Sequence, residues 1–296
     1  MKKIVRSPGS ATIVNAIATG FGSAFGINLD IMAKVKTIDS GIKCNPDLDI
    51  DTTLMELCAK NVFDYYGIDF NGKDHEGMGV EISTESNLPP ASGLSSSSAL
   101  SNSVTLAVSE LICNQFDKNP MNDIEIINLA IDSSFKANVT ITGAFDDATA
   151  SYFGGVTVTD NMNRKILVKE KMPNHKLLIY MPNIESMTAN SDVGRMKLLA
   201  PLVDIAFEKA CHKQYYTALN LNGILYSNAL GFSTQLALDA LEAGAIASGL
   251  SGTGSAYVAI VDDESKDDVK DVWNSYSDSG RIIETEVDNL GTKVIS

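Results

Sequence analysis

The segment PPASGLSSSSAL, residues 89–100, combines residue types that suit the binding of phosphate groups. A lone glycine, Gly93, permits close approach of the backbone, and the serines that follow can cap a helix while its first N–H groups point outward. Such a helix N-terminus attracts anions. One serine suffices for the cap, so the other hydroxyls predict a further partner, a nucleotide triphosphate with its Mg²⁺. A solvated serine-rich turn accounts for the segment equally well when it is taken alone.

A second glycine-rich segment, SGLSGTGSAYVAI over residues 248–260, runs directly into a strand pattern. Its small residues allow the backbone to approach a ligand or a neighbouring helix, and a tight turn in a sheet is an equal alternative. Two other nucleotide motifs are excluded. The chain has no G-x-x-x-x-G-K-[ST] sequence, and the glycines of GFGSAFG, residues 20–26, have the wrong spacing for a dinucleotide-binding turn.

The charge of the chain restricts its partners. With 37 acidic and 23 basic residues, the formal net charge is −14, which argues against binding to nucleic acid. An acidic protein that binds a polyanionic nucleotide must gather basic groups, helix N-termini or a metal ion at one site. The cysteines and histidines are scattered without CxxC spacing, so no structural zinc site is expected. Because neither a signal peptide nor a long apolar run is evident, we expect a cytoplasmic protein that does not bind membranes.

Hydrophobic periodicity outlines the elements that must position these segments. Leu100, Val104, Val108 and Leu111 form one apolar face, which predicts a helix that begins inside the serine run and extends to about Ile112. Further helices are expected at residues 51–66, 123–135, 198–213, 216–230, 234–243 and 266–276. Strands are expected at residues 31–39, 77–86, 138–142, 176–183, 256–263 and 281–287.

The stretch 161–175 is rich in Asn, Lys and Pro, which favours a domain seam. We therefore expect an N-terminal domain over residues 1–165 and a C-terminal domain over residues 166–296. No internal repeat or low-complexity linker is evident in the sequence.

Three segments, in order, resemble the motifs of the GHMP kinases, the family of galactokinase, homoserine kinase, mevalonate kinase and phosphomevalonate kinase. SPGSATIVNA, residues 7–16, is similar to a degenerate first motif. PPASGLSSSSA resembles the second motif, and SGLSGTGSAYVAI resembles the third, glycine-rich one. Within the family, NAIATGFGSAFGINLD, TGAFDDATASYFGG, LNGILYSNAL and AGAIASGLSGTG look most like the archaeal-type shikimate kinases, over nearly the whole chain.

The resemblance implies an α+β protein of two domains, with a left-handed βαβ unit around the phosphate loop and a ferredoxin-like C-terminal half. It implies an enzyme that uses ATP and Mg²⁺ to phosphorylate the 3-hydroxyl of shikimate in aromatic amino-acid synthesis. By motif position, Ser97 binds Mg²⁺, with Ser96 as a close rival. The residues implied to hold the ATP phosphates are Pro89, Pro90, Ala91, Ser92, Gly93, Leu94, Ser95, Ser96, Ser97, Ser98, Ala99, Gly252, Thr253 and Gly254.

The resemblance also gives a role to a pair of carboxylates. Counting back from the glycines of ATASYFGG matches Asp147 to the base of mevalonate-kinase-like members, which accepts the substrate hydroxyl proton or orients that hydroxyl for in-line attack. Alternatively, the pair caps a helix that starts at Ala148, and both hold if Asp146 caps and Asp147 reacts. Homoserine-kinase-like members lack this base. The glutamate that mevalonate kinases carry upstream is replaced by the Phe135–Lys136 region, which leaves Asp146 or water to complete the metal site.

Shikimate carries a carboxylate and three hydroxyls, so we expect its pocket to contain a guanidinium that binds the carboxylate with two hydrogen bonds. Arginines are few, and we favour Arg195, which follows SMTANSDVG and precedes a helix, although a plain surface arginine accounts for it nearly as well. Hydroxyl contacts are expected from residues of the first-motif region, which also suit an ordinary turn, and from the third motif. These substrate residues are Asn15, Thr19, Gly22, Ser23 and Ser255.

Two alternatives stay open at this stage. Homoserine kinase shares the chemistry but would need an acidic group beside the substrate ammonium. The non-enzyme alternative is a nucleotide-binding sensor, against which the intact serine run and Asp147 argue. A homodimer is compatible with the sequence.

Overall fold

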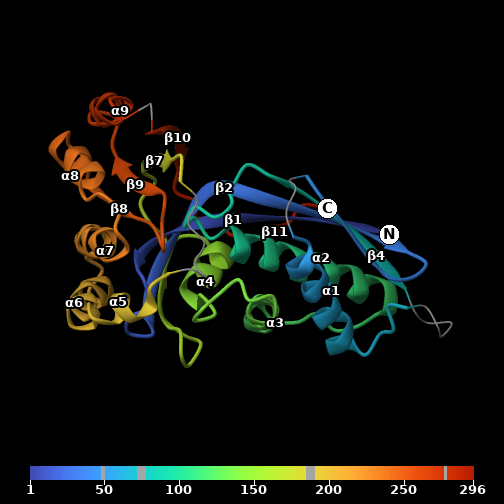
Figure 1. The fold of residues 1–296 in the computed structure, drawn as a ribbon. Coiled ribbons are helices and arrows are strands. Elements are labelled where there is room, and N and C mark those ends of the chain that lie inside the picture. The colour runs from blue at the N-terminus through green and yellow to red at the C-terminus, as the bar shows by residue number, and fades with distance from the viewer. Residues whose placement is uncertain (48–50, 72–77, 185–190, 277–278) are drawn as a thin grey trace.

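Two long N-terminal strands organise the first half of the molecule. The computed structural model describes residues 1–47, 51–71, 78–184, 191–276 and 279–296 (Figure 1). Strands β1 (Lys2–Val14) and β2 (Phe21–Ile38) pair antiparallel along their length. Register shifts at Pro8/Gly9 and Thr12/Val14 interrupt this ladder, and such bulges bend a strand pair.

The other strands of the first sheet pair on either side of β1 and β2. Its strand order is β11-β1-β2-β4-β3, and β5 pairs with the N-terminal part of β2 and then with β6. β3 and β4 are parallel and α1 lies between them in the chain, so the three form a βαβ unit. Its left-handed sense stays a prediction. The other strands are β3 (Ile42–Pro46), β4 (Gly79–Ser86), β5 (Val156–Asp160), β6 (Lys165–Glu170) and β11 (Lys293–Val294).

Helices α1 to α4 cover one face of the first sheet (Figure 1). Their bounds are α1 (Thr53–Tyr66), α2 (Ser96–Phe116), α3 (Asp123–Lys136) and α4 (Phe145–Phe153). α2 carries the apolar face expected from the sequence, and Val104, Val108 and Leu111 on it are fully buried. α3 begins at a capping box formed by Asn122 and Glu125. The helices expected at residues 51–66, from the serine run to about Ile112, and at residues 123–135 are thus confirmed.

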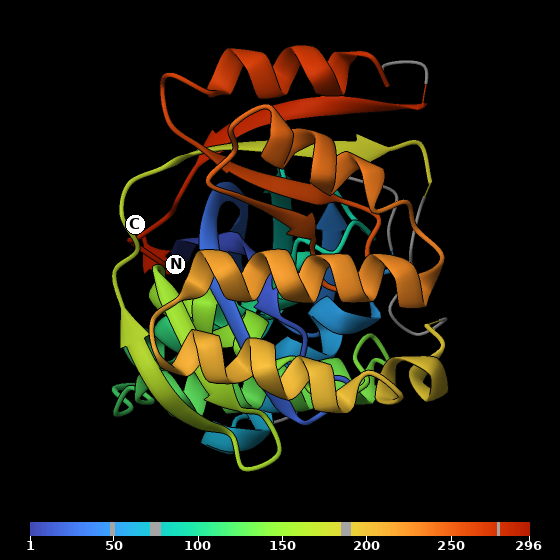
Figure 2. The same cartoon turned by 90° about the vertical axis from the view of Figure 1, so that its left-hand side faces the viewer.

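The second half is built on a smaller antiparallel sheet. Its order is β10-β7-β9-β8. Apart from the additional helices α5, α6 and α8, the elements β7, α7, β8, β9, α9 and β10 occur in the β-α-β-β-α-β order of a ferredoxin-like unit, as expected. Figure 2 shows α6 and α7 side by side. The elements are β7 (Lys176–Pro182), α5 (Val193–Lys197), α6 (Ala200–Cys211), α7 (Tyr215–Leu230), α8 (Gln235–Glu242), β8 (Ala247–Leu250), β9 (Tyr257–Val261), α9 (Lys266–Asn274) and β10 (Gly280–Glu286).

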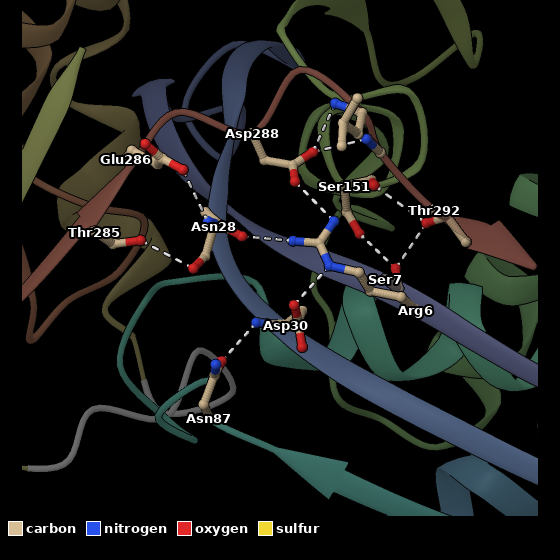
Figure 3. A network of polar contacts seen from close by, with 12 residues as sticks. Arg6, Ser7, Asn28, Asp30, Asn87, Ser151, Thr285, Glu286, Asp288 and Thr292 are labelled. Carbon is tan, nitrogen blue, oxygen red and sulfur yellow. Dashed lines mark hydrogen bonds and ion pairs between the residues drawn. The ribbon is translucent and has the colours of Figure 1, made fainter. Parts of the chain in front are cut away.

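A polar cluster fastens the chain's C-terminal segment to the first sheet (Figure 3). Arg6 on β1 donates hydrogen bonds to Asn28 and Asp30 on β2, at 2.8 and 2.6 Å, and to Asp288 beyond β10, at 2.7 Å. The Asp288 side chain is only 3% exposed, and this guanidinium is its ionic partner. The segment then reaches β11, which pairs with β1. None of the described helices combines the length and apolar character needed to cross a bilayer.

Two local expectations are wrong. The run NVTIT, residues 138–142, is an irregular loop and not a strand. The helix that carries the aspartate pair begins at Phe145, with Ala144 at its N-cap, so Asp146 does not cap a helix starting at Ala148. The seam expected after residue 165 falls at the start of β6, which pairs within the first sheet, and the two-domain division with those bounds stays a prediction.

Candidate active site

A cavity of 390 Å³ lies where both glycine-rich motifs meet the aspartate pair. Its walls come from the end of β1, the loop before α2, the first turn of α2, the loop over residues 138–144, the first turn of α4 and the loop after β8. These segments are far apart in the sequence. The fold therefore assembles one site from all three motif regions.

The loop before α2, residues 89–95, is held in place by the third motif. The hydroxyl of Ser251 donates a 2.7 Å hydrogen bond to the carbonyl oxygen of Gly93, and the Ala256 amide donates to the carbonyl of Ser92 at 3.0 Å. Gly93 has φ of +81°, and a Cβ there would lie 3.0 Å from the carbonyl oxygen of Gly254 and closer still to that of Ser251. Only glycine fits this contact without strain.

The serine run opens α2 much as the sequence suggests, with one correction. Ser95 stands at the N-cap in a left-handed conformation, φ +62°, but its side chain makes no capping hydrogen bond. Its hydroxyl instead accepts a 2.7 Å hydrogen bond from Ser10 on β1. Ser96, Ser97 and Ser98 line the cavity in the first turn of the helix. The first N–H groups of α2 thus lie at the cavity wall, where an anion is favoured.

The two aspartates have different surroundings. Asp146 is 4% exposed and accepts a 2.7 Å hydrogen bond from the amide nitrogen of Asn161. Asp147 is partly exposed and accepts a hydrogen bond from the Ser10 hydroxyl, at 3.3 Å. Burial raises the pKa of Asp146. Burial, and then the negative charge of Asp146, raise the pKa of Asp147, which suits a carboxylate that takes up a proton.

The described lining of the cavity carries acidic but no basic side chains. No lysine, arginine or histidine is among its described lining residues, whereas Asp47, Asp51, Asp146 and Asp147 are. Backbone N–H groups and hydroxyls of the described lining are available to a bound anion. Among the described residues, no group of three or more Asp, Glu, His or Cys side chains forms a metal site.

The structure brings most of the expected phosphate-binding residues to the cavity. Pro90, Ala91, Ser92, Gly93, Ser95, Ser96, Ser97, Ser98, Gly252 and Thr253 line it. Pro89, Leu94 and Ala99 are buried behind that wall. Gly254 also lies outside the lining and packs against Phe232 and Leu250.

The expected substrate residues are less well gathered. Asn15 lines the cavity, but Thr19, Gly22, Ser23, Ser255 and Arg195 are not among its described lining residues. Gly22 packs directly on Asp146, and Ser23 donates a hydrogen bond to the carbonyl of Thr157. The Ser255 hydroxyl donates to the carbonyl of Ile184. Thr19 accepts a hydrogen bond from the Phe21 amide. Arg195 is exposed on α5.

Sequence reasoning missed several residues of the site. Ser10 and Thr12 lie within the first-motif segment that the resemblance singled out, so that motif carried the signal for them. Ser251 lies within the third motif, where its hydroxyl bridges the Thr12 amide and the Gly93 carbonyl. Thr142, Gly143 and Ala144 lie within TGAFDDATASYFGG, which the resemblance also singled out. Asn161 and residues 138–141 had no such signal, because their place in the site arises from packing.

Comparisons with known proteins agree with this architecture. Residues 53–155 match the GHMP kinases N terminal domain, and residues 222–279 match the GHMP kinases C terminal domain. A shikimate kinase of Methanobrevibacter smithii is 59% identical over 100% of both chains. A shikimate kinase of Methanothermobacter thermautotrophicus is 53% identical over 100% of this chain and 99% of its own.

Solved structures show the same fold at much lower identity. The homoserine kinase of Cytophaga hutchinsonii superposes with a TM-score of 0.70 and 16% identity, covering 99% of this chain and 97% of its own. At that identity the likeness concerns the fold alone. The full-length relatives and both family domains show that the chain belongs to the GHMP kinases, in one family with these archaeal shikimate kinases.

Proposed function

We propose that this protein is an ATP-dependent shikimate kinase, which transfers the γ-phosphoryl group of ATP to the 3-hydroxyl of shikimate. The observation that carries the proposal is the 59% and 53% identity to archaeal shikimate kinases along the whole chain. The cavity supports it, because a phosphate-binding helix N-terminus and a carboxylate face the same space. Phosphoryl transfer requires mainly alignment and charge stabilisation, which such a site supplies.

The ATP phosphates would bind at the loop before α2. Gly93 lets the backbone approach, and the first N–H groups of α2 favour the anion. Leu54, Ile31 and Leu88 line an apolar part of the same cavity, which suits the flat, largely apolar face of adenine. The nucleotide would thus extend from this apolar part to the serine run.

Asp147 would receive or orient the proton of the acceptor hydroxyl. Its carboxylate lines the cavity and lies within hydrogen-bond reach of Ser10, which itself bonds to Ser95 at the start of α2. The base is therefore tied to the phosphate loop through two hydroxyls. Because its pKa is raised, Asp147 is a stronger base than an ordinary carboxylate.

Mg²⁺ fits the donor set of this site. The cavity offers hydroxyl and carboxylate oxygens, the hard donors that Mg²⁺ prefers, and Mg²⁺ in kinases takes one or two protein ligands together with substrate phosphates. Ser97, or Ser96 beside it, would hold the ion, with Asp146 or water completing its shell. The ion would neutralise phosphate charge in a cavity whose described walls carry no cation.

An ADP-release assay tests the proposal. The parent and the Asp147→Asn and Ser97→Ala variants would each receive Mg·ATP together with one acceptor at a time: shikimate, homoserine or mevalonate. We expect turnover on shikimate alone, lowered by about 100-fold or more in Asp147→Asn, and lost when EDTA removes Mg²⁺. Turnover confined to another acceptor would overturn the substrate assignment. Silence on all three would favour a nucleotide-binding sensor.

Three further expectations stay predictions. These are the carboxylate-binding role of Arg195, a cytoplasmic location and a homodimer. Size-exclusion chromatography with light scattering would decide the last. Replacing Arg195 by methionine would test the first, because loss of a bidentate guanidinium should raise the KM for shikimate and leave the KM for ATP unchanged.

A further inference from the structure

Helix α7 of the second half forms hydrogen bonds with the residue that follows β1, Asn15. The side-chain oxygen of Asn222 accepts a 3.0 Å hydrogen bond from the Asn15 backbone N–H. The hydroxyl of Tyr226 donates a 3.3 Å hydrogen bond to the Asn15 backbone carbonyl. Asn222 and Tyr226 are both fully buried and lie four residues apart, on one face of α7. Both backbone groups of Asn15 are therefore held by the other half of the molecule.

One end of the Asn15 side-chain amide is already bound within the protein, and the other end is left for a ligand. Its Oδ1 atom accepts a 2.9 Å hydrogen bond from the Ile17 N–H, so the amide cannot turn over without losing that bond. Its Nδ2 group donates no hydrogen bond to the residues that the structure describes. Asn15 itself is 6% exposed and lines the cavity. The side chain thus presents a donor to the site.

Helix α7 is well placed to act as a rigid support. Gly223 packs on Gly249 of β8, and a Cβ at Gly223 would lie 2.8 Å from the Leu250 amide nitrogen. Asn220 accepts a 2.8 Å hydrogen bond from the Ser248 N–H. α7 therefore packs closely on β8 at Gly223, and Asn222 on the same helix contacts Asn15.

Asn15 lies on the acceptor side of the cavity. The strand ladder ends with Val14 paired to Ser23, and the neighbouring Gly22 packs on the Asp146 carboxylate. Asp147, the proposed base, follows directly. An acceptor substrate beside that base is rich in oxygen, and the described lining offers it no cation. A neutral donor of the lining, such as a side-chain amide, can then recognise one of its oxygens.

We propose that Asn222 and Tyr226 are positioning residues for substrate recognition, which hold Asn15 so that its Nδ2 group donates a hydrogen bond to an oxygen of shikimate. The inference rests on the proposed function and names how the second half of the chain contributes to the acceptor site. It also makes the acceptor site dependent on the junction between β1 and α7.

Steady-state kinetics on Asn15→Ala, Asn222→Ala and their double variant test the inference. We expect Asn222→Ala to raise the KM for shikimate about fivefold to tenfold, as for loss of one well-placed hydrogen bond, with the KM for ATP unchanged. Asn220→Ala is the matched control, since it removes a side-chain acceptor from the same helix but faces β8. It should lower the melting temperature without changing either KM.

The double variant separates positioning from general stability. If Asn222 acts through the Asn15 side chain, Asn15→Ala/Asn222→Ala should have the same KM for shikimate as Asn15→Ala alone. If the fold-increases in the KM for shikimate of the two single variants multiply in the double variant, the inference is wrong. Should Asn222→Ala not fold, Tyr226→Phe removes one hydroxyl and keeps the ring, and should raise the KM about twofold. An unchanged KM in Tyr226→Phe and in any folded Asn222→Ala would also overturn it.

The parent enzyme distinguishes this inference from the proposed function. If the parent phosphorylates another acceptor of the panel, the proposed function fails, and the same KM comparison is made with that acceptor. If the parent uses shikimate and its variants keep the parental KM, only the role of α7 fails.

Discussion

Replacing Gly93 by alanine tests the contact between the phosphate loop and the third motif. Gly93 has φ of +81°, and its Cβ would collide with the Ser251 carbonyl oxygen and lie 3.0 Å from that of Gly254. Both opposing atoms belong to backbone, so neither can turn aside as a flexible side chain would. The two loops must separate by roughly 1 Å, which would weaken the hydrogen bond from the Ser251 hydroxyl to the Gly93 carbonyl.

The cost has three parts. A left-handed conformation costs alanine about 1 kcal/mol more than glycine, and loss of the hydrogen bond costs about 1 kcal/mol. Overpacking against backbone adds about 1–2 kcal/mol. We expect Gly93→Ala to lower the free energy of unfolding by about 3–4 kcal/mol, and to raise the KM for ATP because the loop is displaced from the start of α2.

Gly41→Ala supplies the control for this substitution. Gly41 has nearly the same φ, +82°, but a Cβ there has open space around it. It should cost only the conformational part, about 1 kcal/mol. Urea denaturation followed by circular dichroism measures both variants, and a nucleotide titration of activity measures the KM. If Gly93→Ala is no less stable than Gly41→Ala and keeps its KM for ATP, the two loops are not in contact as described.

Two further predictions concern charge. Asp146→Asn removes the negative charge that helps to raise the pKa of Asp147, so the acid limb of a kcat/KM–pH profile should move to lower pH by about one unit. The free energy of unfolding of this variant, relative to the parent, should be higher at pH 8 than at pH 4, because a buried carboxylate with a raised pKa destabilises the parent once it ionises. An equal difference from the parent at both pH values would contradict this. Arg6→Ala leaves Asp288 buried without its guanidinium partner, so urea denaturation should show a free energy of unfolding lower by about 3 kcal/mol. Arg281→Ala, at an exposed position, should lower it by less than about 1 kcal/mol. Similar losses in the two variants would refute the role of the cluster.

Long periodic segments were predicted well from the sequence. The helix through Leu100 and Val108, and the buried strand that begins at Lys176, follow from periodicity and composition over many residues. Short segments were predicted less well. The β-branched run that ends at Thr142 has strand propensity, yet its backbone turns to close the cavity, and Thr140 accepts the Gly143 N–H.

The aspartate pair shows how packing overrides a local rule. An acidic pair before a small residue is a good helix cap, but the helix starts one residue before Asp146. The Asp146 side chain instead bonds to Asn161, 15 residues away. A buried carboxylate takes the partner that the tertiary structure supplies, because leaving it unpaired costs more than losing a cap.

The chemistry available to this protein can be read from its sequence: a glycine, a run of serines at a helix start, and a carboxylate, in the order that the GHMP kinases use. These are local features, and local backbone preferences suffice to form them. Which residues lie in contact depends on the tertiary fold. Ser251 reaches Gly93 across 158 positions, Ser10 reaches Asp147 across 137, and Asn222 reaches Asn15 across 207. Such contacts depend on strand register and on the packing of α7 against β1, which no short stretch of sequence encodes.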